Sequence, residues 1–427
     1  MSDSNEIDIE MHSNPLPASK KQHIQQDQRS TLQQEEWTDD TTHVTTKFPF
    51  FHQCHKQYPL HQIHTWTTRK CPSCGYRYTL FFLEEVLRAH SQVIFCNSPL
   101  SGLLTLTGLL ITDYEAALFG FLATVVATLA AYLLSLDNSN GLYGFNGQLV
   151  GMAVGVLLPR TYTNGNSMVL VRIFMCFIFS TLSVIVANAL RKTMASFELP
   201  FLTLPFNIAA TWLLVGGQYY SLFGTSTTTI EVQNTTTASY HPRSCLRLSM
   251  HAECAYDISG LVQMQAIVQA FFDNFSQIFI LQSQPQLPFV TGGFILIGIG
   301  CYSPLAMLFA AIGSGTAVGT ALILGVDGYE IVQGLWGYNS ILTAVALGGG
   351  IGFVETNWKS SMFAVFGSAV TVMMHGFLRT FFGTMNASAL TLPFCVTTIL
   401  FLLLRDQKGS QMNGKDPPLL FDKRRDE

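Results

Sequence analysis

Hydrophobic positions in this sequence are concentrated in two long blocks, with a polar stretch between them and polar segments at both ends. Residues 91–220 contain eight charged side chains and residues 287–404 contain five. Within these blocks, mostly apolar runs cover 116–136, 168–190 and 360–377. A helix needs ~20 apolar residues to cross the hydrocarbon core of a bilayer. The three runs therefore predict membrane-spanning helices.

Other apolar segments, such as 148–158, are too short or too often interrupted by glycine, proline and polar residues to span alone. Polar backbone at membrane depth is stable only where it lines a cavity or is covered by protein. Broken helices at matching positions of two halves point to a binding or permeation site. We therefore expect such a site inside the helical part of the chain.

The composition supports a membrane protein. The chain has 427 residues, of which 48% are hydrophobic and 12% are charged, whereas about 25% are charged in soluble domains. The mean hydropathy is +0.31. A net charge of −4 provides no basic face for nucleic acid. The sequence predicts an integral membrane protein. Its expected partner is the lipid bilayer, and we expect no binding to nucleic acid.

The charge pattern divides the chain into successive segments. Residues 1–50 carry thirteen charges and few large apolar side chains, a composition typical of disorder. The chain does not begin with a basic region followed by an apolar core, so we expect no cleavable signal peptide. The predicted segments are a cytoplasmic tail (1–50), a membrane-proximal segment (51–78), a first membrane half (79–221), an extracellular loop (222–258), a second membrane half (259–404) and a cytoplasmic tail (405–427).

Two short strings occur once in each membrane half. LYGFNGQL at 142–149 is matched by LWGYNSIL at 335–342. LTLPFN at 202–207 is matched by LTLPFC at 390–395. Because both matches occur in the same order and with nearly the same separation along the chain, the sequence predicts an internal duplication.

The expected topology sets the relative orientation of the two halves. Asn234 begins an Asn-Thr-Thr glycosylation acceptor, which is used only on the lumenal or external side. The C-terminal tail contains Lys423, Arg424 and Arg425, which favour the cytoplasm. If both ends are cytoplasmic and the loop is external, each half crosses the membrane an odd number of times. The predicted fold is therefore an all-α membrane protein with two inverted homologous halves.

The repeated strings place similar chemistry in each half. Phe145 and Tyr338 are expected to form flat slot walls, with Leu149 and Leu342 one helical turn further along each segment. An uncharged slot of this kind does not compensate an ion for the loss of its water shell. The alternative interpretation is that these side chains only pack helices together.

The two Leu-Thr-Leu-Pro-Phe strings add polar groups. Thr203 and Thr391 each provide a hydroxyl that donates or accepts a hydrogen bond. The proline that follows two residues later disturbs regular helix and leaves carbonyl groups free nearby. Such a passage suits a small, planar, neutral solute rich in N–H donors.

These strings, together with SQVIFCNSPLSG at 91–102, resemble the signature blocks of the urea transporter family. The resemblance extends from about 79 to 404. It implies a channel-like facilitator of urea in the plasma membrane, with ten spanning helices and two re-entrant half-helices, or about five and one in each half. It also implies cytoplasmic termini, a homotrimer with one pore in each subunit, no cofactor and no bound metal.

The resemblance assigns roles to particular residues. The family's pore glutamines correspond to Gln92 and Gln277, and its central threonines to Thr203 and Thr391. Its slot residues correspond to Phe95, Phe145, Leu149, Ile278, Tyr338 and Leu342. The amides of the two glutamines match both the N–H donors and the carbonyl acceptor of urea.

The second half departs from the family pattern at two points. The connection after Gln277 is a few residues longer than expected, so Gln282 or Gln284 is an alternative residue for that pore mouth. Tyr338 replaces a phenylalanine, which adds a hydroxyl to one slot.

Two other functions remain as alternatives. The first is an ion-coupled transporter of another small neutral amide, although such coupling usually requires an ionisable group inside the membrane. The second is a zinc-dependent membrane enzyme built on Cys54, Cys71 and Cys74 with nearby histidines.

Overall fold

The computed structural model describes residues 76–136, 140–161, 165–219, 260–281, 289–349, 351, 354 and 356–404. All of them belong to one compact unit, Pro59–Glu427. The described residues form helices and turns, with a single isolated bridge between Thr161 and Ser167 and no strand. The prediction of an all-helical protein is confirmed for this part of the chain.

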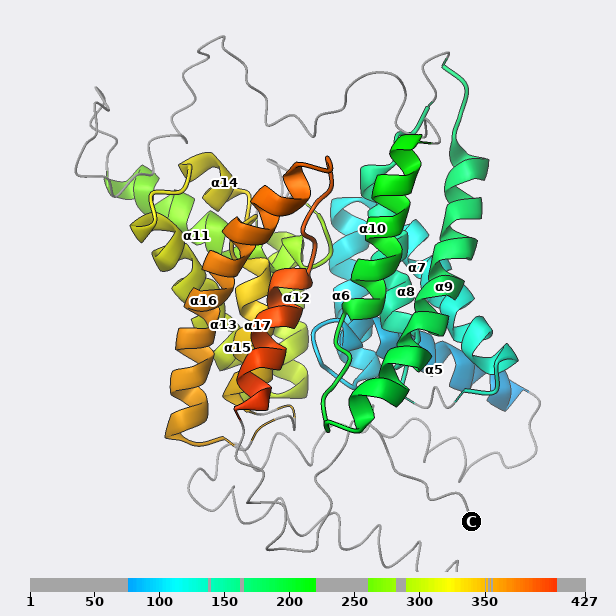
Figure 1. Ribbon diagram of the computed structural model, residues 1–427, viewed down its shortest axis with the longest axis horizontal. Coiled ribbons are helices and arrows are strands. Elements are labelled where there is room, and N and C mark those ends of the chain that lie inside the picture. The colour runs from blue at the N-terminus through cyan, green and yellow to red at the C-terminus, as the bar shows by residue number, and fades with distance from the viewer. Residues whose placement is uncertain are drawn as a thin grey trace, which may run out of the picture. The chain divides into compact units, whose positions relative to one another are not determined.

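Within the described ranges, six helices precede the polar stretch and seven follow it (Figure 1). The first six are α5 (Tyr76–Gln92), α6 (Pro99–Thr112), α7 (Tyr114–Leu133), α8 (Gly144–Leu157), α9 (Val169–Ala195) and α10 (Leu204–Tyr219). The others are α11 (Gly260–Gln277), α12 (Val290–Tyr302), α13 (Pro304–Ile323), α14 (Gly328–Val332), α15 (Tyr338–Gly348), α16 (Trp358–Gly383) and α17 (Leu392–Leu403).

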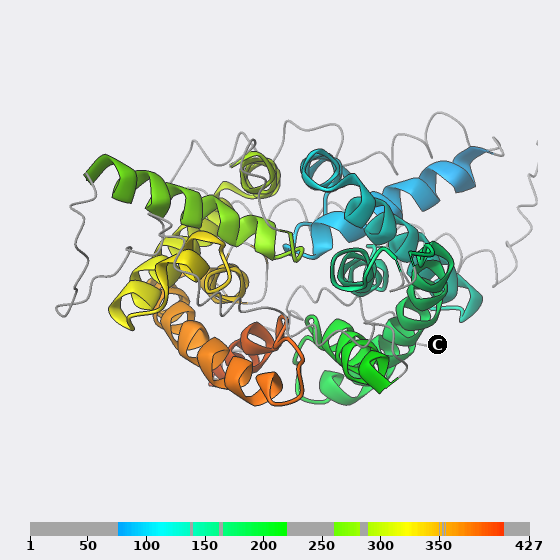
Figure 2. The same ribbon diagram turned by 90° about the horizontal axis from the view of Figure 1, so that it is seen from above.

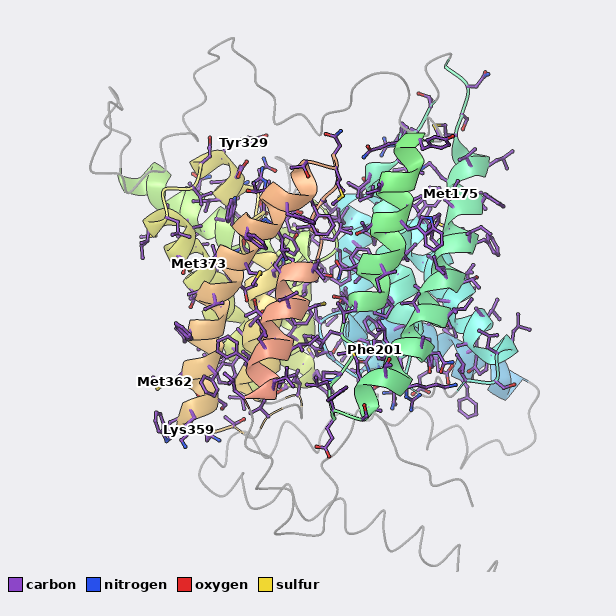
Figure 3. The ribbon with its side chains drawn as sticks, in the orientation of Figure 1. Met175, Phe201, Tyr329, Lys359, Met362 and Met373 are labelled. Atoms are coloured by element: carbon purple, nitrogen blue, oxygen red, sulfur yellow. The ribbon has the colours of Figure 1, made fainter. Side chains whose placement is uncertain are left out.

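Four of the described helices, α7, α9, α13 and α16, are long and apolar enough to cross a membrane. Three of them coincide with the apolar runs of the sequence. The fourth, α13, is not among the long apolar runs of the sequence, because glycine and serine interrupt its apolar pattern. Apolar side chains point outward from these helices, as Met362 and Met373 on α16 show, each 60% exposed (Figure 3). Such surfaces suit hydrocarbon rather than water.

The short helices α6 and α12 lie antiparallel against each other. Near the start of α6, the Ser101 hydroxyl donates to the Gly298 carbonyl oxygen at 2.7 Å. At the other end of α6, the Thr112 hydroxyl contacts the Thr291 hydroxyl at the start of α12. With 14 residues, α6 is ~21 Å long, which is less than the ~30 Å hydrocarbon core. A pair of short helices therefore joins the two halves (Figure 2).

Glycine allows close helix contacts at matching points of the two halves. A Cβ added to Gly102 would lie 1.8 Å from the Leu87 carbonyl oxygen, and one added to Gly292 would lie 2.2 Å from that of Phe272. The connection from Gln277 to Gly292 is longer than the connection from Gln92 to Gly102. The longer connection in the second half thus leads to an equivalent helix contact.

Some sequence predictions lie outside the described residues. These are the glycosylation acceptor Asn234, the candidate zinc ligands Cys54, Cys71 and Cys74, both alternative glutamines Gln282 and Gln284, the N- and C-terminal tails and the polar loop. Helix α5 begins at Tyr76, close to the expected start of the first membrane half.

We expect Gly102→Ala to destabilise the protein strongly, because a methyl group cannot fit against the Leu87 carbonyl without displacing α5 from α6. Overpacking of this kind costs about 1–3 kcal/mol. The matched control is Gly315→Ala on α13, where an added Cβ meets nothing within 4 Å. Thermal unfolding of both variants in detergent measures the difference, and an unchanged midpoint for Gly102→Ala would contradict the close contact.

Candidate functional site

The starts of α10 and α17 meet inside the protein. Thr203 directly precedes α10 and Thr391 directly precedes α17, and their hydroxyl oxygens are 2.7 Å apart. The two side chains are 2% and 3% exposed. Each threonine follows a leucine in the left-handed region, Leu202 at φ +50° and Leu390 at φ +49°. These turns bring the hydroxyls of two segments 188 residues apart into direct contact.

Different partners hold the two threonines. Asn207 lies one turn after Thr203 on α10 and Cys395 lies one turn after Thr391 on α17. The Asn207 Nδ2 donates to the Thr391 hydroxyl at 2.9 Å, and the Thr203 hydroxyl lies 3.1 Å from the Cys395 sulfur. The sequence strings contain both partners, but their pairing across the two halves becomes visible only in three dimensions.

In the first half, the slot residues lie on α8 and on the turn after α5. Phe145 is 7% exposed, and its ring is stacked on that of Phe201, with centroids 6.2 Å apart and planes 7° apart. Leu149 is fully buried one turn further along α8. Phe95, at φ +60°, places its ring 5.8 Å from that of Phe394 on α17. Figure 3 labels Phe201 close to α10, immediately before Leu202 and Thr203 in the chain.

In the second half, Tyr338 and Leu342 lie one turn apart on α15 and are 8% and 1% exposed. The Tyr338 hydroxyl donates to the Leu390 carbonyl oxygen at 2.6 Å. Its ring is edge-on to His375 of α16, with centroids 5.8 Å apart. The aromatic walls are therefore buried and do not face lipid. In the first half a ring is stacked on another ring, whereas in the second half a ring is fixed by a hydrogen bond.

The two predicted mouth glutamines occupy equivalent turns. After Gln92, the amides of residues 94, 95 and 96 donate to the carbonyls of residues 91, 92 and 91. After Gln277, the amides of residues 279, 280 and 281 donate to the carbonyls of residues 276, 277 and 276. Both glutamines are buried, with 4% and 6% of their surface exposed.

The match between these turns identifies one residue that the sequence did not. Ile280, at φ +62°, has the same turn position as Phe95 at φ +60°. The predicted slot residue Ile278 is 1% exposed and has the turn position of Val93. The sequence contains a signal for this residue, because a Ser-Gln pair begins each turn. Ile280 is the third residue after Gln277, just as Phe95 is the third residue after Gln92.

The surroundings of the two glutamines differ. The Gln92 Nε2 donates to the backbone carbonyl oxygen of Asn140 at 3.1 Å. The side-chain Oδ1 of Asn140 accepts from the Asn97 Nδ2, also at 3.1 Å. Arg88 in turn donates to the Asn97 side chain at 2.8 Å. The Gln277 Nε2 is buried and has no partner among the described residues. The carboxamide of Gln92 is thus oriented by neighbours, and that of Gln277 has an unused donor.

Arg379 and Glu330, two charged side chains close to His375, pair with each other. Arg379 donates to both carboxylate oxygens of Glu330, at 2.5 and 2.7 Å, and Trp336 donates to Glu330 at 2.8 Å. Burial raises the pKa of the Glu330 carboxyl, but the hydrogen bonds from Arg379 and Trp336 outweigh this effect and keep the pKa below its ordinary value. Glu330 therefore remains ionised and paired at neutral pH. All of the predicted site residues themselves are uncharged.

Groups of three or more potential metal-ligating side chains are absent from the described residues. The site combines flat apolar walls, two buried amides and two touching hydroxyls. Such a site is suited to hydrogen bonding with a small neutral molecule, and its location among apolar helices defines a membrane transport protein.

Comparison with known proteins identifies the class more closely. The sequence pattern described as "Urea transporter" matches residues 83–406. Urea transporter 1 of the mouse (Mus musculus) is 33% identical over 328 residues, which cover 76% of this chain and 77% of the relative. Urea transporter 1 of the goat (Capra hircus) and of the sheep (Ovis aries) are each 32% identical with the same coverage. The chain belongs to the urea transporter family, whose members are transport proteins and not enzymes.

We expect Thr391→Val to destabilise the protein. Removal of the Thr391 hydroxyl deprives the buried Asn207 amide of an acceptor, and an unsatisfied buried donor costs about 1–3 kcal/mol. The matched control is Thr193→Val, because Thr193 is exposed on α9 and its hydroxyl donates only to carbonyls of its own helix. Thermal unfolding in detergent compares the two variants. Equal midpoints would contradict the role of the Thr391 hydroxyl as an acceptor.

Proposed function

We propose that the protein is a passive, channel-type facilitator that lets urea cross the plasma membrane through a narrow, uncharged passage. The contact between the Thr203 and Thr391 hydroxyls, with an apolar slot in each half, is the observation that carries this proposal. Belonging to the urea transporter family supports urea as the solute. Gln92 and Gln277 form the two mouths, and the threonines form the centre.

The order of groups along the passage fits a dehydrated, flat molecule. A mouth amide replaces part of the water lost by the solute, the aromatic and leucine walls admit only a flat shape, and the central hydroxyls provide hydrogen bonds again. In the first slot the walls are Phe95, Phe145 and Leu149. In the second slot they are Tyr338, Leu342 and Ile278, and we add Ile280 because its turn position matches that of Phe95.

We further propose that the halves are inverted repeats related by a pseudo-two-fold axis in the membrane plane. Three observations support this: α6 and α12 are antiparallel, α10 and α17 meet at their starts, and the turns after Gln92 and Gln277 have the same hydrogen bonds. This arrangement corresponds to about five spanning helices and one re-entrant half-helix in each half. The family resemblance adds cytoplasmic termini and a homotrimer.

An ion-coupled carrier for another amide is the second candidate. The buried histidine His375 lies beside Tyr338, within the reach expected of a coupling group. Glu330, a carboxylate close to His375, is paired with Arg379, which argues against its use as a proton carrier. A coupled carrier requires a gradient of protons or ions, whereas a channel does not.

After an inward urea gradient is imposed, we expect proteoliposomes that contain the protein to regain their volume faster than protein-free liposomes. The rate should not change when proton and sodium gradients are imposed, because a channel has no coupled ion. Stopped-flow light scattering with urea, thiourea, ammonium and glycerol measures both points. A rate that depends on a gradient would favour the coupled carrier, and no acceleration by urea would refute the proposal.

In the same assay, we expect Gln92→Ala and Gln277→Ala each to lower urea permeability about tenfold, the effect of one or two lost hydrogen bonds. The matched control is Gln218→Ala, because Gln218 lies on α10 and bonds to the exposed carbonyls of Met385 and Asn386. The amount of folded protein reconstituted into the liposomes should be the same for all three. Unchanged flux in the two mouth variants would contradict the assignment of the mouths.

We expect Asn234→Gln to remove a glycan from the protein made in eukaryotic cells. Cytoplasmic termini together with the proposed five spanning helices in each half require the loop 222–258 to be external. A gel shift that is lost in the variant and on enzymatic deglycosylation supports this topology. A shift that persists in Asn234→Gln would contradict it.

A further inference from the structure

The centre of the site contains a chain of hydrogen bonds that runs across both halves. Its members are Asn207 and Thr203 from α10 and the turn before it, and Thr391 and Cys395 from α17 and the turn before it. All four are nearly or fully buried. The repeat places the amide of Asn207 at one position and the thiol of Cys395 at the matching position. The two ends of the hydrogen-bond chain therefore differ.

The first end of the chain has a fixed orientation. The Asn207 Oδ1 accepts from the Thr391 backbone N–H at 3.1 Å, and the Asn207 Nδ2 donates to the Thr203 carbonyl oxygen at 2.8 Å. A backbone N–H only donates and a carbonyl only accepts, so these contacts settle which side of the amide is nitrogen. The Nδ2 group therefore donates to the Thr391 hydroxyl and uses both of its hydrogens.

This orientation determines where the hydroxyl protons go. Thr391 already accepts from Asn207, and the acceptor within reach of its own proton among the described residues is the Thr203 oxygen. If Thr203 donated to Thr391 instead, the Thr391 proton would be buried without an acceptor, which costs about 1–3 kcal/mol. Thr391 therefore donates to Thr203, which leaves the Thr203 proton available for the Cys395 sulfur, 3.1 Å from the Thr203 oxygen.

We propose that Asn207 and Cys395 are specificity-determining positioning residues: they turn both threonine protons into the chain, so that the centre offers the solute only hydrogen-bond acceptors. Each hydroxyl oxygen retains a lone pair for the passage, whereas the side-chain hydrogens of Asn207, Thr391 and Thr203 are all directed to acceptors within the protein. Such a centre selects solutes rich in N–H donors. This inference rests on the proposed function, because it concerns the same passage.

Cys395 allows a direct test, since it is the final acceptor of the chain. Cys395→Ser keeps an acceptor for the Thr203 proton, whereas Cys395→Ala removes it and lets that proton turn toward the passage. Cys395→Val serves as a second deletion of the acceptor that retains the side-chain volume. The control is Cys176→Ala, which removes a fully buried thiol on α9.

The measurement is the ratio of acetamide to urea permeability in proteoliposomes. Acetamide has nearly the shape of urea but carries a methyl in place of one amino group, so it has half as many N–H bonds. The wild-type ratio should be well below one and should be the same for Cys395→Ser and Cys176→Ala. In Cys395→Ala and Cys395→Val the ratio should rise about threefold, as expected for one lost hydrogen bond.

A ratio that stays at the wild-type value in the alanine and valine variants would overturn the inference. Equal changes in the serine and alanine variants would also overturn it, because they would indicate packing rather than an acceptor. Failure of the proposed function would give a different result, because the wild-type protein itself would then not accelerate urea permeation.

Discussion

The hydrogen bond between Thr203 and Thr391 is the constraint on which the rest of the site depends. It forms because two helix starts meet in the interior, and each start follows a leucine whose backbone is in the left-handed region. The walls on either side are organised around it. The Tyr338 hydroxyl bonds to the carbonyl of Leu390 directly before Thr391, and Phe201, two residues before Thr203, stacks on Phe145. A change in either turn therefore moves both the centre and a slot wall.

The matching turns of the two halves have the same backbone conformation but different side-chain chemistry. When the two Leu-Thr-Leu-Pro-Phe strings are aligned, Phe201 of the first half corresponds to Ala389 of the second. Without a ring at that position, Tyr338 obtains its support from a hydrogen bond and from His375. Similarly, Gln92 is oriented by Asn140, whereas Gln277 keeps an unused donor among the described residues. In the proposed passage, the surface that a solute meets therefore depends on the side from which it enters.

Much of the fold could be predicted from the sequence, because long apolar runs identify spanning helices directly. Helix α13 is not among the predicted spans, because Gly313, Ser314 and Gly315 interrupt its apolar pattern. In the structure, Gly313 packs closely against α15 and the Ser314 hydroxyl donates to the Phe271 carbonyl. The predicted central threonines do meet. The partnership of Asn207 with Thr391, and of Thr203 with Cys395, could not be predicted, because each joins residues from opposite halves and depends on how those halves pack. The equivalence of Ile280 and Phe95 required the turn geometry.

The left-handed leucines also limit how this sequence can change over generations. Leu202 and Leu390 both have φ near +50°, a region that strongly disfavours β-branched side chains and is more readily accepted by glycine or asparagine. Valine and isoleucine, which otherwise replace leucine readily in apolar surroundings, are therefore poor substitutes here. Evolutionary drift at these two sites is confined by backbone conformation rather than by hydrophobicity, even though neither side chain needs to contact the solute.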